Sequence, residues 1–187
     1  MITNITEFVL DVISRVSQSE YGEYVDQGRI PRVIIVDQQL LENLPQNSLR
    51  ELLSTYKEVG TLGLTIRYAE HETGIFSERN NTLELQEGDI VLFRNDNVTE
   101  NQMLSALTHE LMHSIFPGLG NDNDIDHGHD EACTDYLADF FYQHGNYVTN
   151  YRRIESNDGY MLFYNNFYKE YTDEQRRELL EKYVGKK

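Results

Sequence analysis

The chain has 187 residues and carries 16 Lys and Arg against 32 Asp and Glu, a formal net charge of −16. A length of this order suits one domain with a sizeable core. The negative charge argues against nucleic acids and anionic membranes as partners, because both attract basic surfaces. The single cysteine, Cys133, rules out an internal disulfide.

Residues 1–11 lack the features of a secretory signal. They include Glu7 and Asp11 and have no basic stretch before their apolar residues, whereas signal peptides begin with basic residues followed by an apolar run. Nor is any apolar run of the sequence long enough to span a membrane. We therefore expect a protein of the cytoplasm by default, with secretion by a route that needs no signal peptide as the alternative, in an oligomeric state that the sequence does not set.

The residues before position 99 alternate between helical and extended patterns. Apolar side chains that recur every three or four residues predict amphipathic helices, whereas short apolar runs bounded by Gly or Pro predict strands. In chain order we expect a helix over 5–16, a buried strand over 32–36, a helix over 38–57 interrupted at Pro45, and strands over 62–68, 82–85 and 89–93, with a turn at Gln86-Glu87-Gly88.

The segment 99–116 carries helix signals at both ends. Thr99 and Gln102 fit a capping box, in which the Thr hydroxyl accepts from the Gln102 backbone N–H and the Gln102 side chain reaches back. Pro117 and Gly118 then end the helix. An apolar stripe between these ends predicts a face packed into a core. It consists of Leu104, Leu107, Leu111 and Ile115, and Ala106, His109 and His113 form the neighbouring stripe.

Within this helix, His109-Glu110-Leu111-Met112-His113 reads HExxH. Residues four apart lie on one helix face, with Cβ atoms about 5–6 Å apart, so two imidazoles at this spacing can bind a single Zn²⁺. Glu110, one step around the helix, is placed to take a proton from an activated water. The motif lacks a third protein ligand. The alternative without a metal is an acidic interaction protein in which both histidines are satisfied core residues.

The residues after the motif supply candidates for the third ligand. A loop is expected over 117–130, followed by a helix over 131–141. Glu131 can provide the anion that two neutral histidines favour at zinc. Asp135, one turn later, can accept the other ring N–H of a metal-bound histidine. His127 and His129 are the alternative third ligands.

HExxH followed by Glu131-Ala132-Cys133-Thr134-Asp135 resembles the gluzincins, the thermolysin-like clan of zinc peptidases, whose third ligand is the Glu of an E-A-x-S/T-D-like stretch on the next helix. The likeness covers residues 99–141. It implies that His109, His113 and Glu131 bind one Zn²⁺ per chain. Glu110 would then be the general base and acid, and Asp135 would orient His109. The chain is far shorter than thermolysin and is similar to a minimal core of the clan.

The expected loop after the motif is also rich in acids, at Asp122, Asp124 and Asp126. A solvated acidic loop is our main interpretation and a Ca²⁺ site the alternative. The EF-hand pattern fails, because His127 stands at its Gly position and Cys133 at its Glu position.

Together these patterns predict an α+β, zincin-like fold, with a mixed N-terminal sheet backing the HExxH helix and a helical C-terminal part that ends in a helix over 172–184. Residues 1–187 would form one catalytic domain, with subdomains 1–116 and 117–187. By the same resemblance, one of the strands between Thr61 and Leu85 would be the sheet edge to which an extended peptide pairs.

The predicted function is a zinc-dependent endopeptidase that hydrolyses peptide or protein substrates, with Glu110 as general base and acid. The alternative is a proteolytically inactive zincin-fold protein with a binding or structural role. It is favoured because no residue stands out as the stabiliser of the oxyanion, a group worth about 10²–10³ in rate. The available residues are His144, Tyr147, Tyr151, Tyr160 and Tyr164, and their spacing selects none of them.

Overall fold

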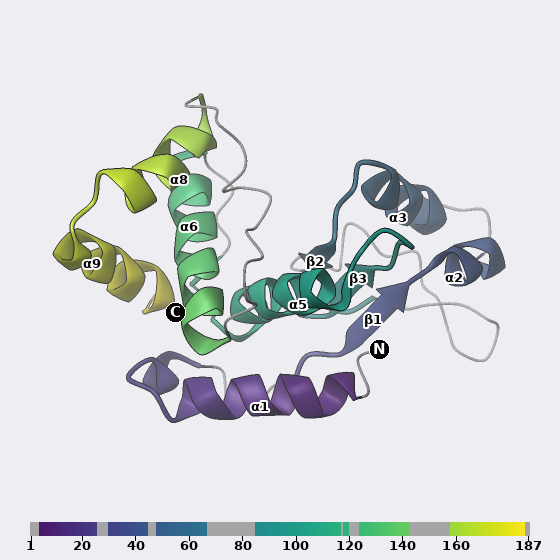
Figure 1. The fold of residues 1–187 in the computed structure, drawn as a ribbon, viewed down its shortest axis with the longest axis horizontal. Helices are drawn as coiled ribbons and strands as arrows, with labels where there is room; N and C mark the ends of the chain where they lie inside the picture. The colour runs from purple at the N-terminus through teal and green to yellow at the C-terminus, as the bar shows by residue number, and fades with distance from the viewer. Residues whose placement is uncertain are drawn as a thin grey trace.

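The computed structural model describes residues 4–25, 30–44, 48–66, 85–116, 118–119, 124–142 and 158–185. These residues form a mostly helical α+β structure with a small mixed sheet (Figure 1), which confirms the expected fold class at this level. The helices are α1 (Ile5–Ser17), α2 (Gln38–Asn43), α3 (Ser48–Glu58), α5 (Glu100–Ile115), α6 (Asp124–Phe141), α8 (Tyr160–Lys169) and α9 (Asp173–Val184), with a 3-10 turn at Gly22–Tyr24, and the strands are β1 (Val33–Val36), β2 (Gly63–Thr65) and β3 (Ile90–Phe93).

The sheet has the strand order β1-β3-β2. β1 runs parallel to β3, with Val33 opposite Ile90, and β2 runs antiparallel to β3, with Leu64 opposite Val91. β3 is buried at every position, which explains its continuous apolar sequence. Among the described strands, β2 lies at an edge of the sheet. The strand predicted over 82–85 has no counterpart at Leu85, and residues 82–84 lie outside the described part.

Side chains of β3 alternate between two hydrophobic clusters, because neighbouring residues of a strand point to opposite faces. Ile90 and Leu92 pack with apolar residues of α1, α5, α6, α8 and α9. Val91 and Phe93 pack with residues of β1, α2 and α3. The sheet is therefore a middle layer, and α8 and α9 lie beside α6 at the end of the molecule away from α2 and α3 (Figure 1).

Several predicted helix boundaries are confirmed. The hydroxyl of Thr99 accepts from the backbone N–H of Gln102 at 3.3 Å, and the Gln102 side chain accepts from the Thr99 N–H at 2.8 Å, so both halves of the capping box are present. The segment 38–57 forms two helices on either side of Pro45. The last helix follows a second capping box at Thr172. Local signals were sufficient at these positions because caps are satisfied within one turn.

The predicted loop over 117–130 is wrong in its second half, because α6 begins at Asp124 instead of Glu131. Gly128 lies in a segment rich in Gly, Asn and Asp, a composition typical of loops, but in the structure it is a helical residue that lies against α8. A Cβ at this position would overlap the carbonyl oxygen of Tyr160. The acids at the start of α6 lie where the helix dipole favours negative charge. Glycine marks the close packing of two helices here, which a single sequence does not distinguish from a turn.

Helix α8 is missing from the sequence prediction. Its buried side chains include Tyr164 and Asn165 as well as Met161 and Phe167, so the apolar stripe is interrupted by residues of modest helix propensity. Packing against α6 accounts for this helix better than its local sequence does. None of the described helices is both long and apolar enough to cross a membrane.

Candidate metal centre

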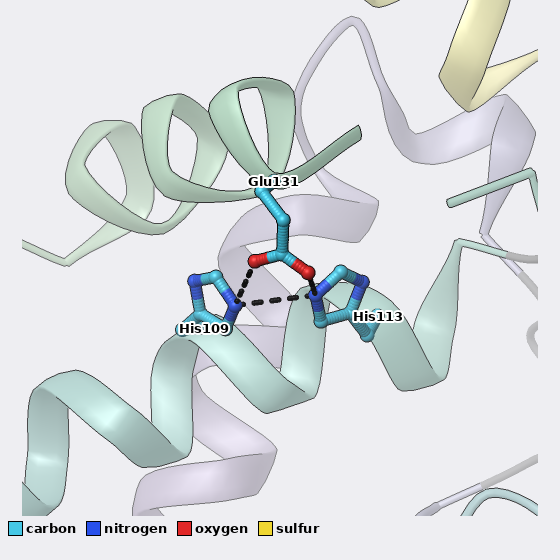
Figure 2. A group of neighbouring side chains, drawn as sticks. All are labelled: His109, His113 and Glu131. Atoms are coloured by element: carbon cyan, nitrogen blue, oxygen red, sulfur yellow. Dashed lines mark hydrogen bonds and ion pairs between the residues drawn. The ribbon is translucent and has the colours of Figure 1, made fainter. Parts of the chain in front are cut away.

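Helices α5 and α6 pack against each other and bring three ligand-bearing side chains together (Figure 2). His109 and His113 lie one turn apart on α5, and Glu131 points toward them from α6. His109 Nε2 is 3.1 Å from His113 Nε2 and 3.1 Å from Glu131 Oε2. His113 Nε2 is 3.4 Å from Glu131 Oε1. This cluster could hold a metal ion, and it joins the residues that the motif analysis selected.

The spacing of these atoms fits a tetrahedral metal site. Ligand atoms about 2.0–2.1 Å from a zinc ion, at tetrahedral angles, lie about 3.3–3.4 Å from one another. The two Nε2 atoms are 3.1 Å apart, and each lies 3.1 to 3.4 Å from a different oxygen of Glu131, so the separations are close to that value but involve both carboxylate oxygens. The side chains therefore stand in an arrangement that a metal ion could enter with small adjustments.

The groups behind the histidines direct the basic nitrogen of each ring at the cluster. His109 Nδ1 lies 2.7 Å from Asp135 Oδ1, and since a carboxylate only accepts, Nδ1 carries the proton of the neutral ring. Behind His113, Thr134 Oγ1 lies 3.4 Å from Nδ1 and donates its own proton to the Asp130 carbonyl at 2.8 Å. Both Nε2 atoms then point toward the Glu131 carboxylate. A proton on His109 Nε2 balances these groups, as the raised pKa of His109 indicates, and a metal ion would bind in place of that proton.

The charges of the cluster keep Glu131 ionised. Burial raises the pKa of Glu131, but His113 and His109 outweigh burial and hold it well below its usual range. Burial lowers the pKa of His109, but the Asp135 and Glu131 carboxylates raise it well above its usual value. Burial also lowers the pKa of His113, which Glu131 offsets in part. An ionised carboxylate is the form that binds a metal.

Glu110 is held by the edge strand β2. Its Oε2 lies 2.9 Å from Thr65 Oγ1, which is also 2.9 Å from the Glu110 backbone oxygen. Gly63 approaches so closely that a Cβ there would lie 2.8 Å from Glu110 Cγ. Sequence reasoning missed both residues of β2. The two residues are two positions apart and so lie on one face of a strand. This is a weak signal, because the spacing alone does not predict which residue they contact.

The two alternative third ligands have different surroundings. His127 lies one helical turn before Glu131, with Nδ1 3.9 Å from Glu131 Oε1 and a side chain that is 38 % exposed, so it stands at the rim of the cluster. His129 is buried, and its Nε2 lies 3.1 Å from the hydroxyl of Tyr171. Of the three candidates, Glu131 is the one that the structure brings against both histidines of α5.

The acidic segment considered for Ca²⁺ is helical from Asp124 onward. A Ca²⁺ loop of the EF-hand type instead wraps the ion with a curved backbone that supplies ligands at alternating positions. Asp122 lies outside the described residues. The loop interpretation is therefore wrong for Asp124 and Asp126, which belong to the first turn of α6.

Two of the tyrosines considered as oxyanion stabilisers are described. Tyr164 is buried, and its hydroxyl donates to Asp135 Oδ2 at 2.5 Å, so it lies behind His109. The Tyr160 ring packs edge-on against His127, with the ring centroids 4.8 Å apart. The other candidates, His144, Tyr147 and Tyr151, lie outside the described residues.

No family model matches this chain, and no curated protein or solved structure is significantly similar to it.

Proposed function

We propose that this protein is a zinc-dependent peptidase with a gluzincin-like core. The observation that carries the proposal is the convergence of two imidazole nitrogens and a buried carboxylate, with separations of 3.1 to 3.4 Å between the nitrogens and from each nitrogen to a carboxylate oxygen. A His₂Glu set is typical of catalytic zinc, in which three protein ligands leave one position for water or substrate. Structural zinc sites use four protein ligands, commonly including cysteine, whereas Cys133 is buried in the hydrophobic core.

The surroundings of α5 support a zincin-like arrangement. Strands β2 and β3 lie against this helix on one side, and α6, which carries the third ligand, packs on it as well. A mixed sheet backing the HExxH helix, followed by a helix with the ligand Glu, is the order that the gluzincin resemblance implies. We infer that the whole chain forms one catalytic domain around this unit.

Different residues of the chain would orient the metal ligands, transfer the proton and position the proton acceptor. A zinc ion bound at the cluster would supply the Lewis acidity that activates water and polarises a carbonyl group. Asp135 and Thr134 hold the imidazole rings so that both Nε2 atoms point to one place. Glu110 accepts a proton from the attacking water and passes it to the leaving amine. Thr65 orients the Glu110 carboxylate before any substrate arrives.

An extended peptide is the substrate class we infer. β2 pairs with β3 along one side and has no second partner strand within the described part of the chain. Such an edge offers N–H and C=O groups to which a peptide can add as a further strand. Because Gly63 and Thr65 contact Glu110, a peptide along β2 would run beside the proposed base.

The test combines metal content with hydrolysis. Plasma mass spectrometry of the untagged protein is expected to find a zinc-to-chain ratio near unity, and the protein is expected to cleave members of a peptide library. Glu110→Gln should retain zinc and lose about 10²–10⁴-fold in turnover, because it removes the proton acceptor but keeps the side-chain volume. The matched control is Glu100→Gln, an exposed position on the same helix, which should keep both properties. A fully active Glu110→Gln variant would show that another group moves the proton.

The second candidate function is a zincin-fold protein that binds metal but cleaves no peptide. It is favoured by the position of Tyr164, whose hydroxyl is bonded to Asp135 behind the cluster and is not available to a substrate oxyanion. Zinc in the protein without cleavage of any library peptide would select this function. Protein purified without zinc would overturn both candidates and leave an acidic protein with core histidines.

A further inference from the structure

The carboxylate behind His109 has a buried partner on a third helix. Tyr164 of α8 donates its hydroxyl to Asp135 Oδ2 at 2.5 Å, while Oδ1 of the same carboxylate lies 2.7 Å from His109 Nδ1. Tyr164 is 1 % exposed and Asp135 is 0 % exposed. A continuous chain of hydrogen bonds therefore links α8 through α6 to a metal-ligand candidate on α5.

We propose that Tyr164 is a positioning residue that sets metal affinity by holding the Asp135 carboxylate in the orientation that His109 requires. This rests on the metal centre of the proposed function, although it does not depend on peptide cleavage. The side-chain torsion that turns an Asp carboxylate is broad, so a hydrogen bond at Oδ1 alone lets the carboxylate plane rock. A second bond at Oδ2 fixes both oxygens, and the His109 ring is then held with Nε2 directed at the cluster.

The hydrogen bond from Tyr164 belongs to a strong class. An O–H donor on an ionised carboxylate makes a short, charge-assisted bond, and exclusion of water at this depth strengthens it. Loss of the direct partner of a metal-bound histidine weakens metal binding by about 10–100-fold. Tyr164 acts one bond further from the ring, so we expect its hydroxyl to be worth about three- to tenfold in zinc affinity.

Helix α8 provides its own control for this inference. Tyr168, one turn after Tyr164, also donates its hydroxyl to α6, in this case to the Ala132 carbonyl at 3.2 Å. The Tyr168 bond fastens α8 to the backbone of α6, whereas the Tyr164 bond reaches the carboxylate that contacts His109. Replacement of either tyrosine by Phe removes one hydroxyl from the same helix pair, so a difference between the two variants reports the connection to the metal rather than helix packing.

The experiment measures Zn²⁺ affinity by competition with a chromophoric chelator for the parent chain, Tyr164→Phe and Tyr168→Phe, with circular dichroism to confirm folding. We expect Tyr164→Phe to bind zinc about three- to tenfold more weakly and Tyr168→Phe to stay within about twofold of the parent. The visible absorption of bound Co²⁺ should shift in the first variant alone, because the ligand field follows the orientation of the ring. Equal zinc affinity in Tyr164→Phe and the parent, or equal losses in both variants, would overturn the inference.

A double-mutant cycle tests the same route independently of the size of the single effect. Asp135→Asn preserves the shape of the side chain but replaces one acceptor oxygen, so it should weaken zinc binding, and Tyr164→Phe added to it should cause no further loss. Independent losses in the double variant would show that Tyr164 acts by another route. If the parent binds no zinc, this inference and the metal centre fall together. If the parent binds zinc but cleaves no peptide, the peptidase proposal alone fails.

Discussion

The two sides of the metal cluster are built from different parts of the fold. On the α6 side, the histidine rings are backed by buried groups, and the chain of hydrogen bonds continues through Asp135 to Tyr164 on α8. On the β2 side, Glu110 is held by Gly63 and Thr65 at the edge of the sheet. Under the proposed function, the groups that orient the metal ligands and the groups that hold the proton acceptor therefore belong to separate elements. Mutations on one side should therefore alter one property and spare the other.

Of the substitutions that test the separation of the two sides, Glu131→Ala on the α6 side is expected to have the largest effect on zinc affinity. Removal of the anionic ligand leaves two histidines, and we expect zinc affinity to fall by about a hundredfold or more. The control is Asp139→Ala, two turns later on the same helix, which should bind zinc like the parent. A chelator competition titration measures both. Zinc retained at parental affinity in Glu131→Ala would move the third ligand to another residue, with His127 as the first to test.

A smaller effect on the other side is expected from Thr65→Val, which keeps the shape and the strand propensity of the residue but removes its hydroxyl. A hydrogen bond to a charged group is worth about 1.5–3 kcal/mol, and the one hydroxyl proton of Thr65 is shared between the carboxylate and the backbone oxygen of Glu110. We therefore expect the lower end of that range, a fall of about tenfold in turnover of a cleaved peptide, while zinc content stays unchanged. Thr65→Ser retains the donor and should restore most of the activity. A parallel loss of zinc in Thr65→Val would show that the two sides of the cluster are not separate.

The smallest effect is expected at the rim of the cluster. His127 lies 3.9 Å from Glu131 with its side chain 38 % exposed, so His127→Ala should change zinc affinity by less than about twofold, as expected for weak contacts near the surface. His113→Ala, measured in the same titration, should lose most of the zinc. A tenfold loss of zinc affinity in His127→Ala would show that His127 belongs to the metal centre and does not merely lie at its rim.

The HExxH helix shows which features a sequence can predict. The cap at Thr99 and the spacing of the two histidines are satisfied within a few turns of one helix, and the structure contains both. Leu107, Leu111 and Ile115 of the predicted apolar stripe are buried in the core, whereas Leu104 is only partly buried. The buried strand β3 is predicted equally well from the sequence. A continuous run of apolar residues is favourable in a strand that the fold buries on both faces, as β3 is. These are local properties, and tertiary contacts did not have to be known.

The start of α6 shows where such reasoning stops. Gly128 suits a loop by composition, yet it lies inside a helix because the backbone of α8 approaches it. Tyr164 is one of several tyrosines without a distinguishing spacing, and its proposed role depends on a carboxylate 29 residues earlier in the chain. In both cases the deciding contact joins two helices, and no local pattern records which helices will meet.

The sequence by itself therefore determined the chemical types available for a metal centre and the helix that presents two of them, because caps, periodicity and i to i+4 spacing are set by neighbouring residues. Tertiary structure alone decided that Glu131 rather than His127 or His129 stands against the histidines, and that Thr65, 45 residues before Glu110, holds the proposed base. The physical reason is that such pairs are joined by packing between elements distant in the chain, where each contact depends on the burial of the whole core.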